Sequence, residues 1–198
     1  MSSKKNTKMA TVGMPIFLVV LSFILIGGYW YIDRNAENTK TENLTETELL
    51  LSKDLDNFYP STPRSVVLFF GRIMQCVYTQ DITEEELRAL VELQQKLFDV
   101  ELVAINPIDT FYQSALIEWQ TFKENEMAFV GYQADRASNV KTWYKDGIEY
   151  ASLVMYYSLR EDGRVSANYN EFILRKDEQN KWKILGWRET AAQELEME

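Results

Sequence analysis

The pattern of hydrophobic and polar positions divides the chain into three parts. Residues 12–32, VGMPIFLVVLSFILIGGYWYI, form a 21-residue run without a charge. Between about residues 60 and 125, apolar residues recur three and four positions apart, a spacing typical of amphipathic helices. From residue 128 onward, aromatic and β-branched residues dominate, as in strands. The pattern therefore predicts a membrane helix, then helices, then a sheet.

The uncharged run has the length of a transmembrane helix. At about 1.5 Å of rise per residue it matches a hydrocarbon core about 30 Å thick. Tyr29, Trp30 and Tyr31 at its end suit the membrane interface, and the lysines before it favour a cytoplasmic amino terminus. No Ala-x-Ala site follows, which disfavours a cleaved signal peptide. We expect a cytoplasmic leader at 1–11 and a single span in the lipid bilayer at 12–32.

The part beyond the span is expected to lie outside the cytoplasm, on the cell surface side of the membrane. Residues 33–48 are rich in Asn, Thr and Glu and predict a flexible stalk. Residues 49–190 are long enough for one domain with its own core. Residues 191–198 form an acidic tail.

Three helices are expected first in this domain. Thr62 suits the N-cap of the first, with Pro63 at its first position. Thr83 and Glu86 form a capping box at the start of the second. The third follows Pro107 and places aromatic residues on one face.

The second half of the domain predicts an antiparallel sheet. Asp162 and Gly163 are typical central residues of a two-residue hairpin turn. Residues 182–189 predict a last strand. The hairpin register then pairs Tyr157 with Asn168, Met155 with Asn170, Leu153 with Phe172 and Ala151 with Leu174 on the core face, and Tyr156 with Tyr169 and Val154 with Glu171 on the other face.

Composition excludes several classes of function. The formal net charge is −9, and all 30 acidic residues follow residue 32, so the surface repels nucleic acids. The chain has no His, which removes the usual general base and the commonest transition-metal ligand. A single Cys permits no internal disulfide. We therefore expect no nucleic acid, metal or cofactor as a partner.

The last strands carry a family resemblance. The segments EYA at 149–151, NEFILRK at 170–176 and WKILGW at 182–187 resemble the NTF2-like superfamily. This resemblance implies an α+β fold, in which three helices pack on one face of a curved antiparallel sheet to form a cone. With YPSTP at 59–63, the chain is also similar to single-pass membrane proteins of Gram-positive gut bacteria. Its order of short amino terminus, span and outer domain resembles VirB8-type subunits of secretion and conjugation machines.

Three functions remain open, because the NTF2-like fold serves enzymes, ligand carriers and assembly modules alike. A pocket enzyme of the isomerase or dehydratase type would need an inward acid or base, for which Asp109 and Glu118 are the candidates. Asp109 is equally explained by the helix dipole, and Glu118 by its place beside an apolar stripe. We expect no enzyme and no catalytic residue, but a binding module that uses a protein partner or self-association.

Two sets of residues are the candidates for binding. A small-ligand carrier or sensor would use side chains from the predicted core face, although ordinary core packing also explains the aromatic ones. A protein-interaction module would use tyrosines on the outer sheet face. The ligand set is Tyr112, Trp119, Tyr157, Asn168 and Asn170, and the partner set is Tyr150, Tyr156 and Tyr169.

Overall fold

The computed structural model of the chain describes residues 44–190. The predicted leader, the span at 12–32, most of the stalk and the acidic tail lie outside the described residues. Within 44–190, none of the helices combines the length and the apolar character needed to cross a membrane.

Helices form the first half of the described chain. Thr62 and Thr83 cap the first two long helices, as predicted. The capping box at Thr83 was also predicted, whereas the one that Thr62 forms with Ser65 was not. Two helices of six residues were not predicted, because so few residues carry little periodic pattern. The helices are α2 (Glu46–Leu51), α3 (Pro63–Thr79), α4 (Glu84–Gln95), α5 (Val100–Ile105) and α6 (Ile108–Glu124).

Helix α2 extends the folded part toward the amino terminus. Residues 46–48, which the sequence analysis gave to the stalk, lie in this helix. Thr45 caps it, and Thr47 and Leu50 are buried. An ion pair of 2.6 Å between Glu46 Oε1 and Arg72 Nε joins α2 to α3.

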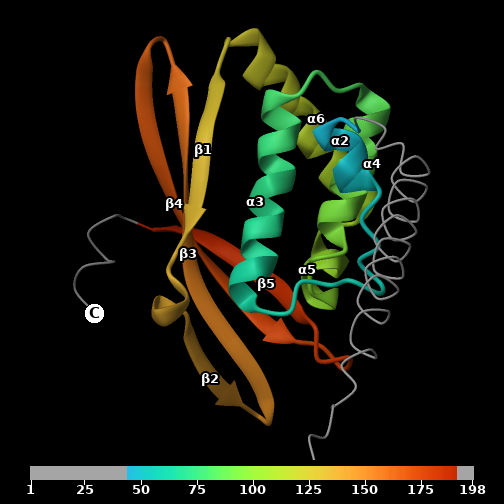
Figure 1. The fold of residues 1–198 in the computed structure, drawn as a ribbon, viewed down its shortest axis with the longest axis vertical. Helices are drawn as coiled ribbons and strands as arrows, with labels where there is room; N and C mark the ends of the chain where they lie inside the picture. The colour runs from blue at the N-terminus through green and yellow to red at the C-terminus, as the bar shows by residue number, and fades with distance from the viewer. Residues whose placement is uncertain (1–43, 191–198) are drawn as a thin grey trace, which may run out of the picture. The chain divides into compact units, whose positions relative to one another are not determined.

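The second half is one antiparallel sheet in the order β1-β3-β4-β5, in which β2 also pairs with β3 (Figure 1). Strands β1 and β2 pair with successive parts of the same edge of β3. Asp162 and Gly163 form the turn between β3 and β4, and all six predicted residue pairs are confirmed. The elements are β1 (Ala128–Ala134), the 3-10 helix η1 (Ala137–Asn139), β2 (Lys141–Lys145), β3 (Ile148–Glu161), β4 (Arg164–Lys176) and β5 (Trp182–Thr190).

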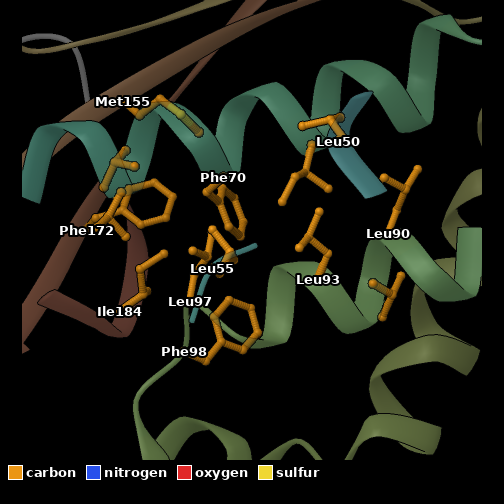
Figure 2. Packing of buried hydrophobic residues seen from close by; sticks show 14 of the residues in the cluster. Leu50, Leu55, Phe70, Leu90, Leu93, Leu97, Phe98, Met155, Phe172 and Ile184 are labelled. Carbon is orange, nitrogen blue, oxygen red and sulfur yellow. The ribbon is translucent and has the colours of Figure 1, made fainter. Parts of the chain in front are cut away.

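The helices lie on one face of the sheet, which confirms the predicted α+β class (Figure 1). Side chains of α2, α3 and α4 meet those of β3, β4 and β5 in a single buried cluster (Figure 2). Phe70 of α3 packs edge-on against Phe172 of β4, with 5.3 Å between the ring centroids.

Helix α3 approaches the sheet most closely at Gly71. A Cβ atom built there would lie 2.5 Å from Cδ2 of Tyr132 on β1 and 3.0 Å from the sulfur of Met155 on β3. Both side chains belong to the sheet under the helix, so neither can move without disturbing the packing. The separation between α3 and the sheet therefore requires glycine at this position.

A buried ion pair joins the segment before α5 to the sheet. Asp99 is 2% exposed, and its carboxylate accepts two hydrogen bonds of 2.7 Å from the guanidinium of Arg175 on β4. The same carboxylate accepts from the backbone N–H of Glu101 and so caps α5. The backbone N–H of Asp99 donates to the carbonyl of Ile184 on β5, at 2.8 Å. This one residue thus holds a helix start and two strands together.

The substitution Gly71→Ala is expected to lower the free energy of unfolding by about 1–3 kcal/mol, because the added methyl group overlaps the Tyr132 ring. Urea unfolding followed by circular dichroism measures the change. Gly186→Ala is the control, since no atom lies within 4 Å of its added Cβ. Equal stability of both variants would contradict the close approach.

The substitution Asp99→Ala is expected to cost about 3–5 kcal/mol. It removes the buried partner of the mostly buried Arg175 guanidinium, which keeps the exposed Glu101 as a carboxylate partner, and it removes the cap of α5. Asp109→Ala, which removes the exposed ion pair to Arg88, should leave stability nearly unchanged. Thermal unfolding of both variants tests the contrast, and a similar loss in the two would refute it.

Candidate functional site

A cavity of about 320 Å³ lies between the helices and the sheet. Helices α3, α4 and α6 form one side of it, and strands β3, β4 and β5 form the other. Phe70, Met155 and Phe172 are buried and form its inner part. Figure 2 shows Met155 and Phe172 at one side of the core, next to Phe70. Glu118 and Trp187 line it but are exposed, which places them at the opening.

The polar groups of the cavity gather around one hydrogen bond. The hydroxyl of Tyr78 on α3 donates to Oε1 of Glu118 on α6, at 2.7 Å. Burial, and then the negative charge of Glu118, raise the pKa of Tyr78 above its usual range. Burial also raises the pKa of Tyr157, while Asn170 acts in the opposite direction. Both phenols therefore stay protonated near neutral pH and can offer hydrogen bonds.

The structure brings two of the five predicted ligand residues to this cavity. Tyr157 and Asn170 line it. Tyr112 is buried on α6, with the guanidinium of Arg88 5.1 Å from its ring centroid, and does not line it. Trp119 is also buried outside the lining, with the ammonium of Lys123 3.7 Å from its ring centroid. Asn168 lies opposite Tyr157 on β4, beyond the cavity.

The orientation of α6 explains why Tyr112 and Trp119 do not line the cavity. Its lining residues are Phe111, Ser114, Ala115 and Glu118, at helical spacing. The sequence analysis placed aromatic residues on one face of this helix. Phe111 does line the cavity, but Tyr112 and Trp119 lie beside the face that borders it. Gln94 and Tyr78 were missed as lining residues, since nothing in the sequence shows which sides of α3 and α4 border a hollow.

The two candidate catalytic acids lie in different surroundings. Asp109 is at the surface, where it accepts a 2.8 Å ion-pair contact from Arg88 and its side chain is 82% exposed. Glu118 lines the cavity opening. The two carboxylates therefore do not converge on one site. Within residues 44–190, no group of three potential metal ligands is present.

The outer face of the sheet carries the three predicted partner-binding tyrosines in two separate places. Tyr156 and Tyr169 form a pair with ring centroids 5.6 Å apart, and the Tyr156 hydroxyl donates to Gln133. Tyr150 stacks on Trp143 of β2, also at 5.6 Å. Between the two pairs, Ser152 and Val154 are buried beside the connection from β1 to β2. The three tyrosines assigned to the outer face therefore do not form one continuous surface.

The connection from β1 to β2 is attached to the sheet by Asp135. Its backbone N–H donates to the carbonyl of Val154, and its carboxylate accepts from the Val154 N–H, at 2.8 and 2.9 Å. Arg64 of α3 donates to the Asp135 carbonyl at 2.6 Å. A mostly polar hollow of about 540 Å³ lies beside this connection and contains the ion pair of Glu171 with Arg188.

The hairpin of β2 and the start of β3 is exposed on both faces. All five residues of β2 are exposed, with 38% for Trp143 and 73% for Tyr144. Ile148, which opens β3, is 39% exposed. Figure 1 shows this hairpin at the end of the sheet that the helices leave uncovered. The sequence analysis named only Tyr150 here, although the segment KTWYK before Asp146 and Gly147 carries two further aromatic residues.

The fold is an α+β domain with an open cavity between its helices and its sheet. Residues 1–187 match the family described as Domain of unknown function (DUF6715), and the chain belongs to this family. No curated protein matches the chain.

Among solved structures, CagV, a VirB8 homolog of the T4SS from Helicobacter pylori strain 26695, is similar to this chain. The likeness covers 64% of this chain and 97% of that chain, with 12% identity and a TM-score of 0.35. A likeness this slight indicates neither a common function nor a common partner. Membership of the NTF2-like superfamily and the resemblance to proteins of Gram-positive gut bacteria stay predictions.

The raised pKa of Tyr78 predicts a pH dependence of stability. Tyrosines of the unfolded chain ionise near about pH 10, whereas Tyr78 in the folded state stays protonated. Its contribution is complete below pH 10 and is lost as the pH rises toward the folded-state pKa. Tyr78→Phe should therefore lose less stability than the wild type between about pH 8 and pH 10.5.

Urea unfolding at the two pH values measures this difference. Tyr144→Phe is the control, because Tyr144 is 73% exposed. Removal of its hydroxyl should leave the change in stability between the two pH values as it is in the wild type. If Tyr78→Phe loses as much stability as Tyr144→Phe, the Tyr78 hydroxyl does not have the surroundings described.

Proposed function

We propose that the chain is a single-pass membrane protein whose NTF2-like domain, outside the cytoplasm, binds another protein and catalyses no reaction. The observation that carries this proposal is the hairpin of β2 and β3, where Trp143 and Tyr144 are exposed on a strand with an open edge. Within residues 44–190, β2 pairs with β3 alone. The uncharged run at 12–32 supports the anchor.

The backbone of β2 can accept a further strand. Asp146 and Gly147 both have positive φ, 52° and 80°, which is the geometry of a two-residue type I′ turn. Lys145 and Ile148, which flank this turn, then exchange backbone hydrogen bonds, and the pattern alternates along the strand. Thr142 and Tyr144 consequently direct their backbone N–H and C=O groups to the open edge. An extended segment of a partner can pair there.

The charge of β2 favours a different protein over a second copy. Lys141 and Lys145 lie at its two ends. Antiparallel pairing of two copies of β2 would bring these lysines opposite each other, and like charges facing each other across a sheet are destabilising. The expected partner therefore offers a strand with acidic or neutral residues, as in an envelope-assembly module. Self-association is the less favoured form of the same proposal.

Crosslinking in intact cells of the native host tests the proposal. A photo-crosslinking residue in place of Tyr144 should yield a larger covalent species. The same residue in place of Phe58, which is 80% exposed but lies outside the hairpin, should not. A species of twice the chain's mass would identify self-association.

A backbone variant makes the test specific for strand pairing. Thr142→Pro removes one outward N–H and leaves the bonds to β3 intact, so it should abolish the crosslink at position 144. Thr142→Ala keeps the N–H and should retain the crosslink. Loss in both variants, or retention in both, would contradict pairing at this edge.

A second candidate function is that of a small-ligand carrier or sensor, which the cavity of about 320 Å³ favours. This volume is near the lower end of the range of about 300–1,000 Å³ that ligand pockets occupy. The third possibility, a pocket enzyme, has less support because Asp109 is exposed and paired and the chain lacks His.

A further inference from the structure

The side chains that line the cavity have one consistent chemistry. Its lining residues include six aromatic rings and one carboxylate, that of Glu118. Among the described residues around it, no Lys or Arg contributes to the lining. The aromatic residues are Phe70, Tyr78, Phe111, Tyr157, Phe172 and Trp187.

Within residues 44–190, the carboxylate of Glu118 has no cationic partner. It accepts a hydrogen bond of 2.7 Å from the Tyr78 hydroxyl, which is a neutral donor. Asp109, in the first turn of the same helix, differs in this respect because it is paired with Arg88. A charge that lies at the opening of an aromatic cavity and is not neutralised there attracts a cation.

Aromatic faces and a carboxylate together favour one class of ligand. The faces of Trp and Tyr rings attract ammonium groups, and a nearby carboxylate adds direct charge attraction. Trp187, 42% exposed, and Tyr78 lie on the same cavity as Glu118. Deeper in, the lining is apolar and suits a hydrocarbon or aromatic body. An anion would find no basic group in this lining and would meet a negatively charged protein.

We propose that the cavity binds a small organic cation, an amine or quaternary ammonium compound with an apolar body, and that Glu118 provides its charge partner. The apolar body lies against Phe70 and Phe172, and the charged group stays at the opening. This inference rests on the second candidate function, the use of the cavity as a ligand site, and is independent of the hairpin.

Three probes of one shape test the proposal: 2-phenylethylamine, 2-phenylethanol and phenylacetate. They share a ring and differ in charge. The full chain is reconstituted in nanodiscs of zwitterionic lipid, and empty nanodiscs give the background. Titration calorimetry at pH 7 should show that the amine binds at least 10-fold more tightly than the alcohol and that phenylacetate does not bind.

Two charge variants on α6 identify the partner. Glu118→Gln should weaken binding of the amine at least 10-fold and leave binding of the alcohol unchanged. Glu124→Gln removes a carboxylate from the same helix at a position that does not line the cavity. It should change neither the binding of the amine nor that of the alcohol. Equal effects of the two variants on the amine would overturn the role of Glu118, because they would reflect net charge alone.

The remaining outcomes separate this inference from the function on which it rests. If the amine and the alcohol bind equally well, the cavity is a ligand site but not one for cations, and the proposal is wrong. If none of the three probes binds, both the cation site and the use of the cavity for ligands are refuted.

Discussion

The length of β3 is the constraint on which the rest of the structure depends. Its 14 residues span about 46 Å at about 3.3 Å per residue, whereas the 17 residues of α3 span about 25 Å. A helical layer of this length cannot cover the strand from end to end. The sheet must therefore extend beyond the helices, and Figure 1 shows it doing so at the β2 hairpin. The side chain of Tyr144 belongs to the face of the sheet that the helices cover in its other part. Tyr144 itself is 73% exposed, because no helix reaches it.

The cavity follows from how unevenly the helices approach the sheet. At Gly71 the backbone of α3 lies almost against Tyr132 and Met155, so no space remains at that point. Two helical turns later, Tyr78 is the residue of α3 that lies on the same side as Gly71, and it lines the cavity together with residues of α6. Phe111 and Ala115 do not fill the gap between α6 and β4. The close contact at the middle of α3 therefore lies directly beside the cavity, which Phe70 and Met155 also line.

Interactions between neighbours in the sequence were predictable. The N-cap at Thr62 and the capping box at Thr83 involve residues three positions apart, and the two-residue turn at Asp162 determined the register of β3 with β4. Interactions between distant residues were not. The bond of Asp99 to Arg175 joins residues 76 positions apart, and that of Tyr78 to Glu118 joins residues 40 apart.

Of the residues predicted to bind a ligand, some line the cavity and others do not. Tyr157 and Asn170 reached the cavity because the hairpin register placed them on the inner face. Tyr112 and Trp119 did not, because the rotation of α6 about its axis depends on packing against α4 and not on its own sequence. The three candidate tyrosines were assigned to the outer face, but the β1–β2 connection, held by Asp135, lies between Tyr150 and the other two. No pattern in the sequence singled out Asp135. Irregular connections carry no periodicity from which their path could be read.

We propose binding, and not catalysis, for this cavity. A general acid or base works best with a pKa near the ambient pH, and the chain has no His to provide one. Burial raises the pKa of Tyr78, so its hydroxyl is protonated near neutral pH and donates to Glu118. That fixed bond orients the carboxylate at the opening while leaving its charge uncompensated. An oriented, uncompensated charge beside aromatic faces recognises a ligand by its own charge and shape, and such recognition requires no proton transfer.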